Sequence, residues 1–299
     1  MKICWFDDDR LGLVDGNEIL DVTQALEVLP VNRYPAPLGD ALIAHLDEVK
    51  VEIEKAIGLA RRRPIAGVRL RSAVARPSKI IGAPVNYADH IQETQLAANT
   101  FKQYEGGIKE QGLFLKANSS LAGCGDGITL HFPSRPTHHE IELAVVIGKP
   151  GKNIPKPEAL AHVAGYAIAL DMTLRGPEDR SFRKSIDTYS VLGPWLTTAD
   201  EISDPQHLAF SLSVNGQQRQ RSDTGQMILD IAQQIAWAST FYTLLPGDIL
   251  MTGTCAGVGP VQAGDHIVAT IERLGEMSVE VHHGHSPVSG RTEQSTCLR

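Results

Sequence analysis

The sequence predicts a β-rich α+β protein, with a small N-terminal α+β domain followed by a larger domain made mostly of strands. Three observations support this prediction. Helical periodicity extends from about Gly39 to Arg63. From Lys79 onward, apolar residues occur mainly in short alternating segments separated by turn residues. One longer helix is expected in that second region, from about Gln226 to Leu244, and it ends before Pro246-Gly247.

The N-terminal region begins with a predicted β-hairpin. Leu11 to Val14 and Glu18 to Val22 are strand-like and flank Asp15-Gly16-Asn17, where Asp-Gly tolerates the positive φ of a tight turn. In the helix that follows, one face is expected to be buried, because apolar residues recur at steps of three and four: Leu42, Leu46, Val49, Ile53 and Ile57.

A basic stretch with two prolines, Pro64 to Ser78, is typical of a linker, and we place a domain boundary near Arg76. The predicted organisation is an accessory domain over residues 1–75, a main domain over 76–282 and a polar tail over 283–299. The tail is expected to be loose, and the histidine cluster of 282–285 is expected to be a solvated terminus.

Within the main domain, the alternation of apolar and polar residues predicts individual strands. Phe210, Leu212 and Val214 precede the turn Asn215-Gly216, and a second alternating set (Ile267, Ala269 and Ile271) follows Gly264-Asp265. The segment from Asn86 to Gly112 is polar and has no periodicity. A loop of that length inside a domain is usually functional, so we interpret it as a lid over a site.

Composition limits the possible functions. Hydrophobic residues make up 42% and charged residues 21% of the chain, as in ordinary globular proteins. A formal net charge of −7 argues against nucleic acid as a partner. Apolar runs such as Leu143 to Ile147 are too short to cross a membrane, and the acidic N-terminus is unlike a secretory signal. The four cysteines are far apart, which favours a reduced, cytoplasmic protein.

An acidic cluster is the clearest candidate site. Glu140 and Glu142 occupy positions i and i+2 of a predicted strand, so they project from one face about 7 Å apart. Asp171 ends a second strand-like segment, from Gly165. Three hard oxygen ligands suit Mg2+ or Mn2+. Two other interpretations stay open from the residues alone: a solvated strand with unrelated acids, or a zinc site that includes one of the adjacent His138 and His139.

Several motifs, in their order along the chain, resemble the fumarylacetoacetate hydrolase family over roughly Lys79 to Val281. The resemblance implies rolled mixed β-sheets, a homodimer, and Mg2+ held by Glu140, Glu142 and Asp171. The motifs are Asn86-Tyr87-Ala88-Asp89-His90-Ile91-Gln92-Glu93, His139-Glu140-Ile141-Glu142-Leu143, Asp171-Met172-Thr173-Leu174-Arg175, Lys184-Ser185-Ile186-Asp187, Gly193-Pro194-Trp195, Val214-Asn215-Gly216, Pro246-Gly247-Asp248, Gly253-Thr254 and Gly257-Val258-Gly259.

The resemblance also assigns expected roles to residues outside the acidic trio. Members of the family act on oxo-acids through an enolate, so a cation is needed beside the carboxylates; Lys184 is the first candidate and Arg175 the second. His90 and Glu93 match the family's histidine–glutamate pair and would activate water. Gly253 and Thr254 are expected to bind the substrate, with Thr254 lining the pocket and donating to the substrate carboxylate.

Two positions depart from the family pattern. Cys255 stands where proline is usual, and no histidine is matched to it, so we interpret it as a tolerated small residue. Glu178 stands where hydrolase members often carry glutamine. As a substrate-binding residue it would disfavour a dianion unless it were paired with Arg175 or Arg180. This second departure leaves both substrate and reaction type open.

The leading hypothesis is a Mg2+-dependent hydrolase of a C–C bond in an acylpyruvate or related β-diketo acid, in aromatic or sugar-acid catabolism. The alternative is an isomerase, tautomerase or decarboxylase acting at the same metal site on a 2-oxo or 2-hydroxy-diene acid, such as oxaloacetate or 2-hydroxyhepta-2,4-dienedioate. A catalytically inactive binding protein on the same fold is a third hypothesis, which the presence of all three acids disfavours.

Overall fold

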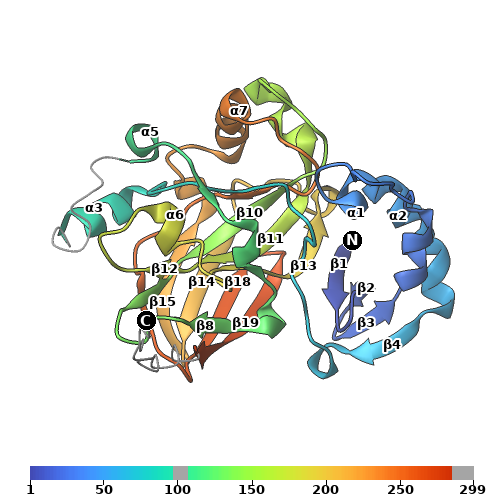
Figure 1. Ribbon diagram of the computed structural model, residues 1–299, viewed down its shortest axis with the longest axis horizontal. Helices are drawn as coiled ribbons and strands as arrows, with labels where there is room; N and C mark the ends of the chain where they lie inside the picture. Colours follow the sequence, from blue (N-terminus) through green and yellow to red (C-terminus); the bar gives the residue numbers. More distant parts are fainter. Residues whose placement is uncertain (97–106, 285–299) are drawn as a thin grey trace, which may run out of the picture.

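The computed structural model describes residues 1–96 and 107–284 (Figure 1). The described residues form three β-sheets with short helices around them, so the predicted β-rich α+β class is confirmed. None of the helices in these residues is long and apolar enough to span a membrane. The predicted tail lies outside the described residues from His285 onward.

The largest sheet has 11 strands, and ten of them form a continuous order, β4-β3-β2-β1-β13-β11-β10-β16-β5-β6, with β7 paired to β13. Their bounds are β4 Arg61–Pro64, β3 Glu18–Asp21, β2 Arg10–Asp15, β1 Lys2–Phe6, β13 Ser190–Thr198, β11 Val163–Asp171, β10 Ile141–Ile147, β16 Ile249–Met251, β5 Ile80–Gly82, β6 Phe114–Lys116 and β7 Leu121–Ala122.

Two smaller sheets and six helices complete the described fold. One sheet has the order β12-β9-β17 and the other β15-β14-β18-β19-β8. Their strands are β12 Thr173–Leu174, β9 Thr137–His139, β17 Gly259–Val261, β15 Gln217–Asp223, β14 Ala209–Val214, β18 His266–Ile271, β19 Gly275–His283 and β8 Ile128–Leu130. The helices are α1 Ala41–Ala44, α2 Leu46–Ala56, α3 Ala88–Leu96, α5 Ile108–Gln111, α6 Arg180–Arg183 and α7 Ile231–Phe241.

The N-terminal region, blue in Figure 1, continues the large sheet. Its first strand, β1, pairs antiparallel with β13, and Ile3 lies opposite Leu196. Helices α1 and α2 pack their apolar face on β1 to β3, with Leu42, Val49 and Ile53 buried in a shared core. The hairpin predicted around Asp15-Gly16-Asn17 is present as β2 and β3. The boundary near Arg76 stays a prediction.

The predicted helix from Gly39 to Arg63 is too long at both ends. It is broken at His45, and α2 ends at Ala56. The arginines of 61–63 belong instead to edge strand β4, which pairs with β3. Strand pairing accompanies the difference, because the four residues of β4 lie in register with Glu18 to Asp21 of β3. Arg62 also contacts Glu18 and Asp15 across the strands, at 2.9 Å and 3.0 Å.

Three further predicted segments also differ. The helix expected over Gln226 to Leu244 spans only Ile231–Phe241, because Asp230 and Gln233 form a capping box that fixes its start. The predicted lid over 86–112 is not a plain loop: it contains α3 and α5, while residues 97–106 lie outside the described part of the chain. His282 and His283 belong to β19 rather than to a loose tail.

Strand β10 lies at the centre of the large sheet and is buried on both faces. Leu143, Val145 and Ile147 face one apolar cluster, and Ala144 and Val146 face the other. Double burial explains why this strand has a continuous apolar sequence instead of an alternating one. It also gives the acidic residues at the start of the strand a rigid base.

Candidate active site

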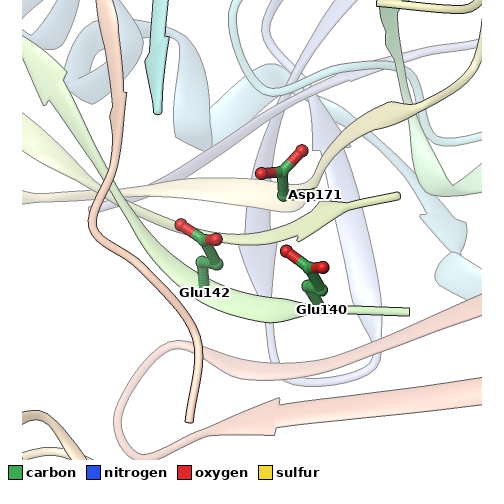
Figure 2. A group of neighbouring side chains, drawn as sticks. All are labelled: Glu140, Glu142 and Asp171. Atoms are coloured by element: carbon green, nitrogen blue, oxygen red, sulfur yellow. The ribbon is translucent and has the colours of Figure 1, made fainter. Parts of the chain in front are cut away.

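Strand register brings the three predicted metal ligands together. Ile141 on β10 pairs with Leu170 on β11, and the Asp171 amide then donates to the Glu140 carbonyl at 2.9 Å. Because Glu140, Glu142 and Asp171 fall on the same face of the paired strands, their carboxylates converge, as Figure 2 shows. One oxygen from each lies within 4.8 Å of the others. All three residues are buried, at 6%, 2% and 1% exposure.

This carboxylate triad fits a divalent cation. Its donor set is made only of hard oxygen atoms, the set that Mg2+ and Mn2+ prefer. The zinc alternative is not supported, because neither His138 nor His139 belongs to the group of described side chains whose ligand atoms lie close together. Among the described residues, the triad is the group of His, Cys, Asp and Glu side chains that could hold a metal.

Three cationic side chains surround the triad. Lys184 donates to Glu140, Asp171 and the Thr173 hydroxyl, each at 2.7 Å. Arg175 donates to the other oxygen of Glu140 at 3.1 Å. Lys116, which was not predicted, donates to the second oxygen of Asp171 from the far side. The two lysines therefore bracket one carboxylate.

These contacts set the charge state of the two glutamates in opposite directions. Burial would raise the pKa of Glu140, but the ammonium of Lys184 and the guanidinium of Arg175 outweigh it and hold the pKa below its usual range. Burial and the neighbouring Asp171 carboxylate instead raise the pKa of Glu142 well above its usual value. Glu142 thus carries the like-charge repulsion that a bound dication would relieve.

The predicted His90–Glu93 pair is formed on α3. His90 Nδ1 lies 2.8 Å from Glu93 Oε2, as expected for residues three apart on a helix. Glu93 Oε1 also accepts a hydrogen bond from the Gly257 amide at 2.9 Å. Burial would raise the pKa of Glu93, but the hydrogen bonds from His90 and Gly257 prevail and lower it. An ionised Glu93 fixes the ring hydrogen on Nδ1 and leaves Nε2 as the basic nitrogen.

Gly253 and Thr254 support the triad from the loop after β16. The Gly253 amide donates to Glu142 at 2.6 Å, and its φ of +97° requires glycine. Thr254 lines the cavity, but its hydroxyl donates to the Ile141 carbonyl at 2.7 Å. A hydroxyl has one hydrogen, so the expected donation from Thr254 to a substrate would require this bond to break.

Glu178 does not lie where it was expected. Its carboxylate is about one third exposed and forms a two-pronged ion pair with Arg135, at 2.9 Å and 2.6 Å, rather than with Arg175 or Arg180. It is not among the residues that line the cavity around the triad. Its carbonyl, and not its carboxylate, faces the site, through a hydrogen bond from Arg183.

One cavity contains the triad together with most of the predicted residues. It is lined by Ala83, Pro84, Val85, His90, Gln111, Phe114, Glu140, Glu142, Asp171, Arg175, Arg180, Arg183, Lys184 and Thr254. Sequence reasoning missed Lys116 behind the cavity, and Arg180 and Arg183 as lining residues. The signal for Lys116 would have been charge balance, because three buried carboxylates need more than one cation.

Fold and site together define an enzyme whose cavity combines a divalent-metal ligand set with a histidine–glutamate pair. The model of the fumarylacetoacetate hydrolase C-terminal family matches residues 79–282, and the chain belongs to this family.

Similar proteins of known name agree with that assignment. The chain is 52% identical to a maleylpyruvate hydrolase of Aquipseudomonas alcaligenes, over 94% of this chain and 99% of that protein. A crystal structure of a maleylpyruvate hydrolase from Sphingobium sp. SYK-6, in complex with manganese(II) and pyruvate, has a TM-score of 0.81 and 40% identity, over 95% of this chain and 100% of that one. A mitochondrial oxaloacetate tautomerase of Rattus norvegicus is 37% identical, over 83% of this chain and 82% of that protein.

Proposed function

We propose that this protein is a metal-dependent acylpyruvate hydrolase that cleaves the C–C bond between the acyl group and a pyruvate unit. The observation that carries the proposal is the presence of two separate sets of catalytic groups in one cavity. The carboxylate triad could hold a metal and a 2-oxo acid, and His90 lines the same cavity. The hydrolase relatives, at 52% and 40% identity, support this reaction class.

We further propose that Glu140, Glu142 and Asp171 hold Mg2+ or Mn2+. When bound, the cation would supply Lewis-acid stabilisation of the enolate charge that develops as the C–C bond breaks, and a 2-oxo acid could chelate it. Lys184 and Arg175, which contact the triad, offset its negative charge so that an anionic substrate can approach.

His90 would act as the general base. With Glu93 bound to Nδ1, the Nε2 atom can take a proton from water. The hydroxide adds to the carbonyl carbon of the acyl group, and the bond to the pyruvate methylene then breaks. The bonding electrons leave on pyruvate as its enolate, which takes up a proton. One water is consumed, and a carboxylic acid and pyruvate are the products.

A tautomerase is the second candidate function, and the 37% identity to the oxaloacetate tautomerase of Rattus norvegicus favours it. Moving a proton between carbon and oxygen of oxaloacetate needs the same enolate stabilisation, but no attack by water. The two reactions therefore share the triad and differ in how far they depend on water activated by His90.

Steady-state turnover of maleylpyruvate, fumarylpyruvate, acetylpyruvate and enol oxaloacetate, with Mg2+ and with Mn2+, tests the proposal. We expect hydrolysis of at least one acylpyruvate, and a kcat about 100-fold to 10,000-fold lower in His90→Ala. His207→Ala is the matched control, because His207 forms the same type of pair with Asp204 at 2.7 Å on an exposed surface. If oxaloacetate is the one substrate converted, the hydrolase proposal is wrong and the tautomerase stands.

The remaining expectations accompany this proposal. A small-molecule oxo-acid is the expected ligand, a homodimer the expected assembly and the cytoplasm the expected location. Light scattering of the purified protein tests the assembly, because a dimer doubles the mass of the 32.4 kDa chain.

A further inference from the structure

Asn86 is a fully buried residue between strand β5 and helix α3, and it takes no part in the proposed catalytic steps. Its side-chain nitrogen donates to the Thr252 carbonyl at 2.9 Å and to the Leu229 carbonyl at 3.0 Å. Its side-chain oxygen accepts from the Leu229 amide at 2.8 Å, and its backbone carbonyl accepts from the Ile228 amide at 2.8 Å. One orientation of the side-chain amide satisfies both carbonyls and the amide, so these contacts fix the residue in place.

On one side, Asn86 packs against the loop that supports the metal-ligand triad. In this loop the Gly253 amide donates to Glu142 at 2.6 Å. A Cβ atom at Gly253 would lie 2.7 Å from the Cβ atom of Asn86, so the two backbones are in close contact. The loop has its own attachment to β10, because the hydroxyl and the amide of Thr252 both donate to the Leu143 carbonyl, at 2.8 Å and 3.1 Å. It therefore offers Asn86 an acceptor that is already held beside the triad.

On the other side, Asn86 leads into the helix that carries the candidate base. Helix α3 begins at Ala88, and His90 on its first turn lines the cavity. A helix of nine residues is too short to be stable by itself, so tertiary contacts must set its direction. The bonds of Asn86 hold the chain immediately before this helix. Asn86 thus connects the element that carries the base to the loop that supports the metal ligands.

The residue before Asn86 has a strained backbone. Val85 has a φ of +43°, and a β-branched residue rarely adopts this left-handed conformation. Such a conformation persists where the surrounding structure enforces it. Here the chain is anchored on both sides of the turn, by the bond from the Ala83 amide to the Met251 carbonyl at 3.0 Å and by the bonds of Asn86. The turn redirects the chain from β5 into α3, so its conformation determines the direction in which α3 begins.

We propose that Asn86 is a positioning residue, which enforces the left-handed turn at Val85 and thereby fixes the position of His90 relative to the metal-ligand triad. The proposal rests on the proposed function, in which His90 is the general base. Asn86 is not among the residues that line the cavity, so it acts through His90 and not by contact with the substrate.

Asn86→Ala tests the assignment, because it removes the side-chain bonds and leaves every residue of the cavity in the chain. We expect kcat for an acylpyruvate to fall about 10-fold to 100-fold, the loss that a displacement of about 1 Å can cause. Calorimetry should show affinities for Mn2+, and of the Mn2+-loaded protein for pyruvate, within about threefold of wild type. The triad should keep these affinities because β10 holds the Thr252 loop independently of Asn86.

Two double-variant cycles separate positioning from general support of the fold. In a His90→Ala background, Asn86→Ala should lower the remaining kcat by less than about threefold, because residues that act as one unit are not additive. In a Val85→Gly background, Asn86→Ala should reduce kcat by a smaller factor than in the wild type, since glycine adopts a positive φ readily. A loss as large in the His90→Ala background as in the wild type would overturn the proposal. A loss as large beside glycine as beside valine would overturn the role of the turn.

Hydrogen exchange of the Mn2+-loaded protein reports on α3 without turnover. In Asn86→Ala we expect the amides of residues 88–93 to exchange at least about 10-fold faster, while those of β10 keep their wild-type rates. Asn86→Ser retains a hydroxyl that can donate to one carbonyl, and it should show smaller changes in the same direction. The serine variant covers the case in which the alanine variant does not fold.

Gln206→Ala is the matched control. The side-chain amide of Gln206 also joins two separate segments, by donating to the Thr224 carbonyl at 2.6 Å and accepting from the Ile231 amide at 3.0 Å. Gln206 is not among the residues that line the cavity, so this variant should keep both kcat and the exchange rates of α3. Equal effects of Gln206→Ala and Asn86→Ala on kcat would overturn the proposal.

The two readouts distinguish this proposal from the proposed function. Faster exchange of α3 in Asn86→Ala, in a protein that hydrolyses no acylpyruvate, would support the role of Asn86 in holding α3 and contradict the proposed function. Hydrolysis by the wild type with an unchanged kcat in Asn86→Ala would support the proposed function and overturn the role of Asn86.

Discussion

Gln220 donates a hydrogen bond from its side-chain amide to the hydroxyl of Thr254, over 2.7 Å, inside the protein core. The oxygen of the same amide accepts from His139 Nδ1 at 2.9 Å and from the Ile141 amide at 3.2 Å. One side chain of β15 therefore joins the strand that carries Glu140 and Glu142 to the loop that follows β16. Gln220 is fully buried, and the donors of His139 and Ile141 use its side-chain oxygen as their acceptor.

Gln220→Leu should consequently destabilise the protein and weaken metal binding. It leaves buried donors on His139 and Ile141 without an acceptor, which costs about 1–3 kcal/mol of unfolding free energy for each unsatisfied group. Denaturant unfolding and titration with Mn2+ measure the two effects. Gln218→Leu, an exposed position on the same strand, is the control. Equal behaviour of the two variants would show that the Gln220 network does not position the triad.

Lys116 should contribute most to the stability of the protein when no metal is bound. Lys116 and Lys184 each donate to one oxygen of Asp171. Removing one partner of a buried ion pair costs about 3–5 kcal/mol, so Lys116→Met should lower the unfolding free energy of the metal-free protein by that order. Saturating Mn2+ should reduce this loss of unfolding free energy, because a dication compensates the charge of Asp171 in place of the ammonium. Lys149→Met, at an exposed lysine, should change little. A deficit that is unaffected by Mn2+ would contradict this account.

Metal binding should depend on pH through Glu142, whose pKa is raised by burial and then by Asp171. Above the ordinary carboxyl pKa of about 4.3, the unfolded chain has lost this proton while the metal-free folded protein keeps it. The raised pKa therefore makes the metal-free protein less stable as pH rises toward the folded pKa.

A bound cation needs the ionised carboxylate, so binding must displace the proton of Glu142. We expect the affinity for Mn2+ to increase as the pH rises above the ordinary carboxyl range toward the raised pKa of Glu142, with release of up to about one proton per metal. Calorimetry in two buffers with different enthalpies of ionisation counts the proton. Metal binding with no proton release and no pH dependence would show that Glu142 is already ionised in the metal-free protein.

Cys255 should be chemically inert. Burial, and then the charge of Asp89, raise the pKa of this thiol to about 12, so almost no thiolate exists at neutral pH. Cys4 and Cys124 are also buried, with pKa values raised to about 12 and about 11. In a Cys297→Ser background, we expect no fast reaction of the native protein with a thiol reagent, and three reactive thiols after unfolding. Cys255→Ala should keep kcat within about threefold of wild type; inactivation by the reagent would indicate a catalytic thiol.

Much of the site could be predicted from sequence because it lies on regular strands. A period of two places Glu140 and Glu142 on one face, and the apolar run before Asp171 indicates a second buried strand. What spacing alone could not supply is the register between β10 and β11, which brings Asp171 beside Glu140. The resemblance to a family, rather than spacing, implied that Asp171 lies with Glu140 and Glu142.

The residues that sequence reasoning missed come from short elements with little local pattern. Lys116 ends a three-residue strand, and Arg180 and Arg183 belong to a four-residue helix. Such segments are held by tertiary contacts, so neither periodicity nor propensity indicates their direction. The same applies to Arg61 to Pro64, where pairing with β3 decides the conformation. Glu178 shows a further limit, because its residue type suggested a carboxylate in the cavity whereas its carbonyl faces the site.

The position of Glu93 has a consequence for how α3 can act. Its two carboxylate oxygens have separate partners: His90 belongs to the same helix, while Gly257 belongs to the segment between β16 and β17. Displacement of α3 from that segment would break the bond to Gly257 and leave the bond to His90 intact. The imidazole and its carboxylate would therefore travel as one rigid unit. When α3 returned to the cavity, the tautomer of His90 that leaves Nε2 as the basic nitrogen would already be set. Only the distance from Nε2 to the substrate would have to be re-established.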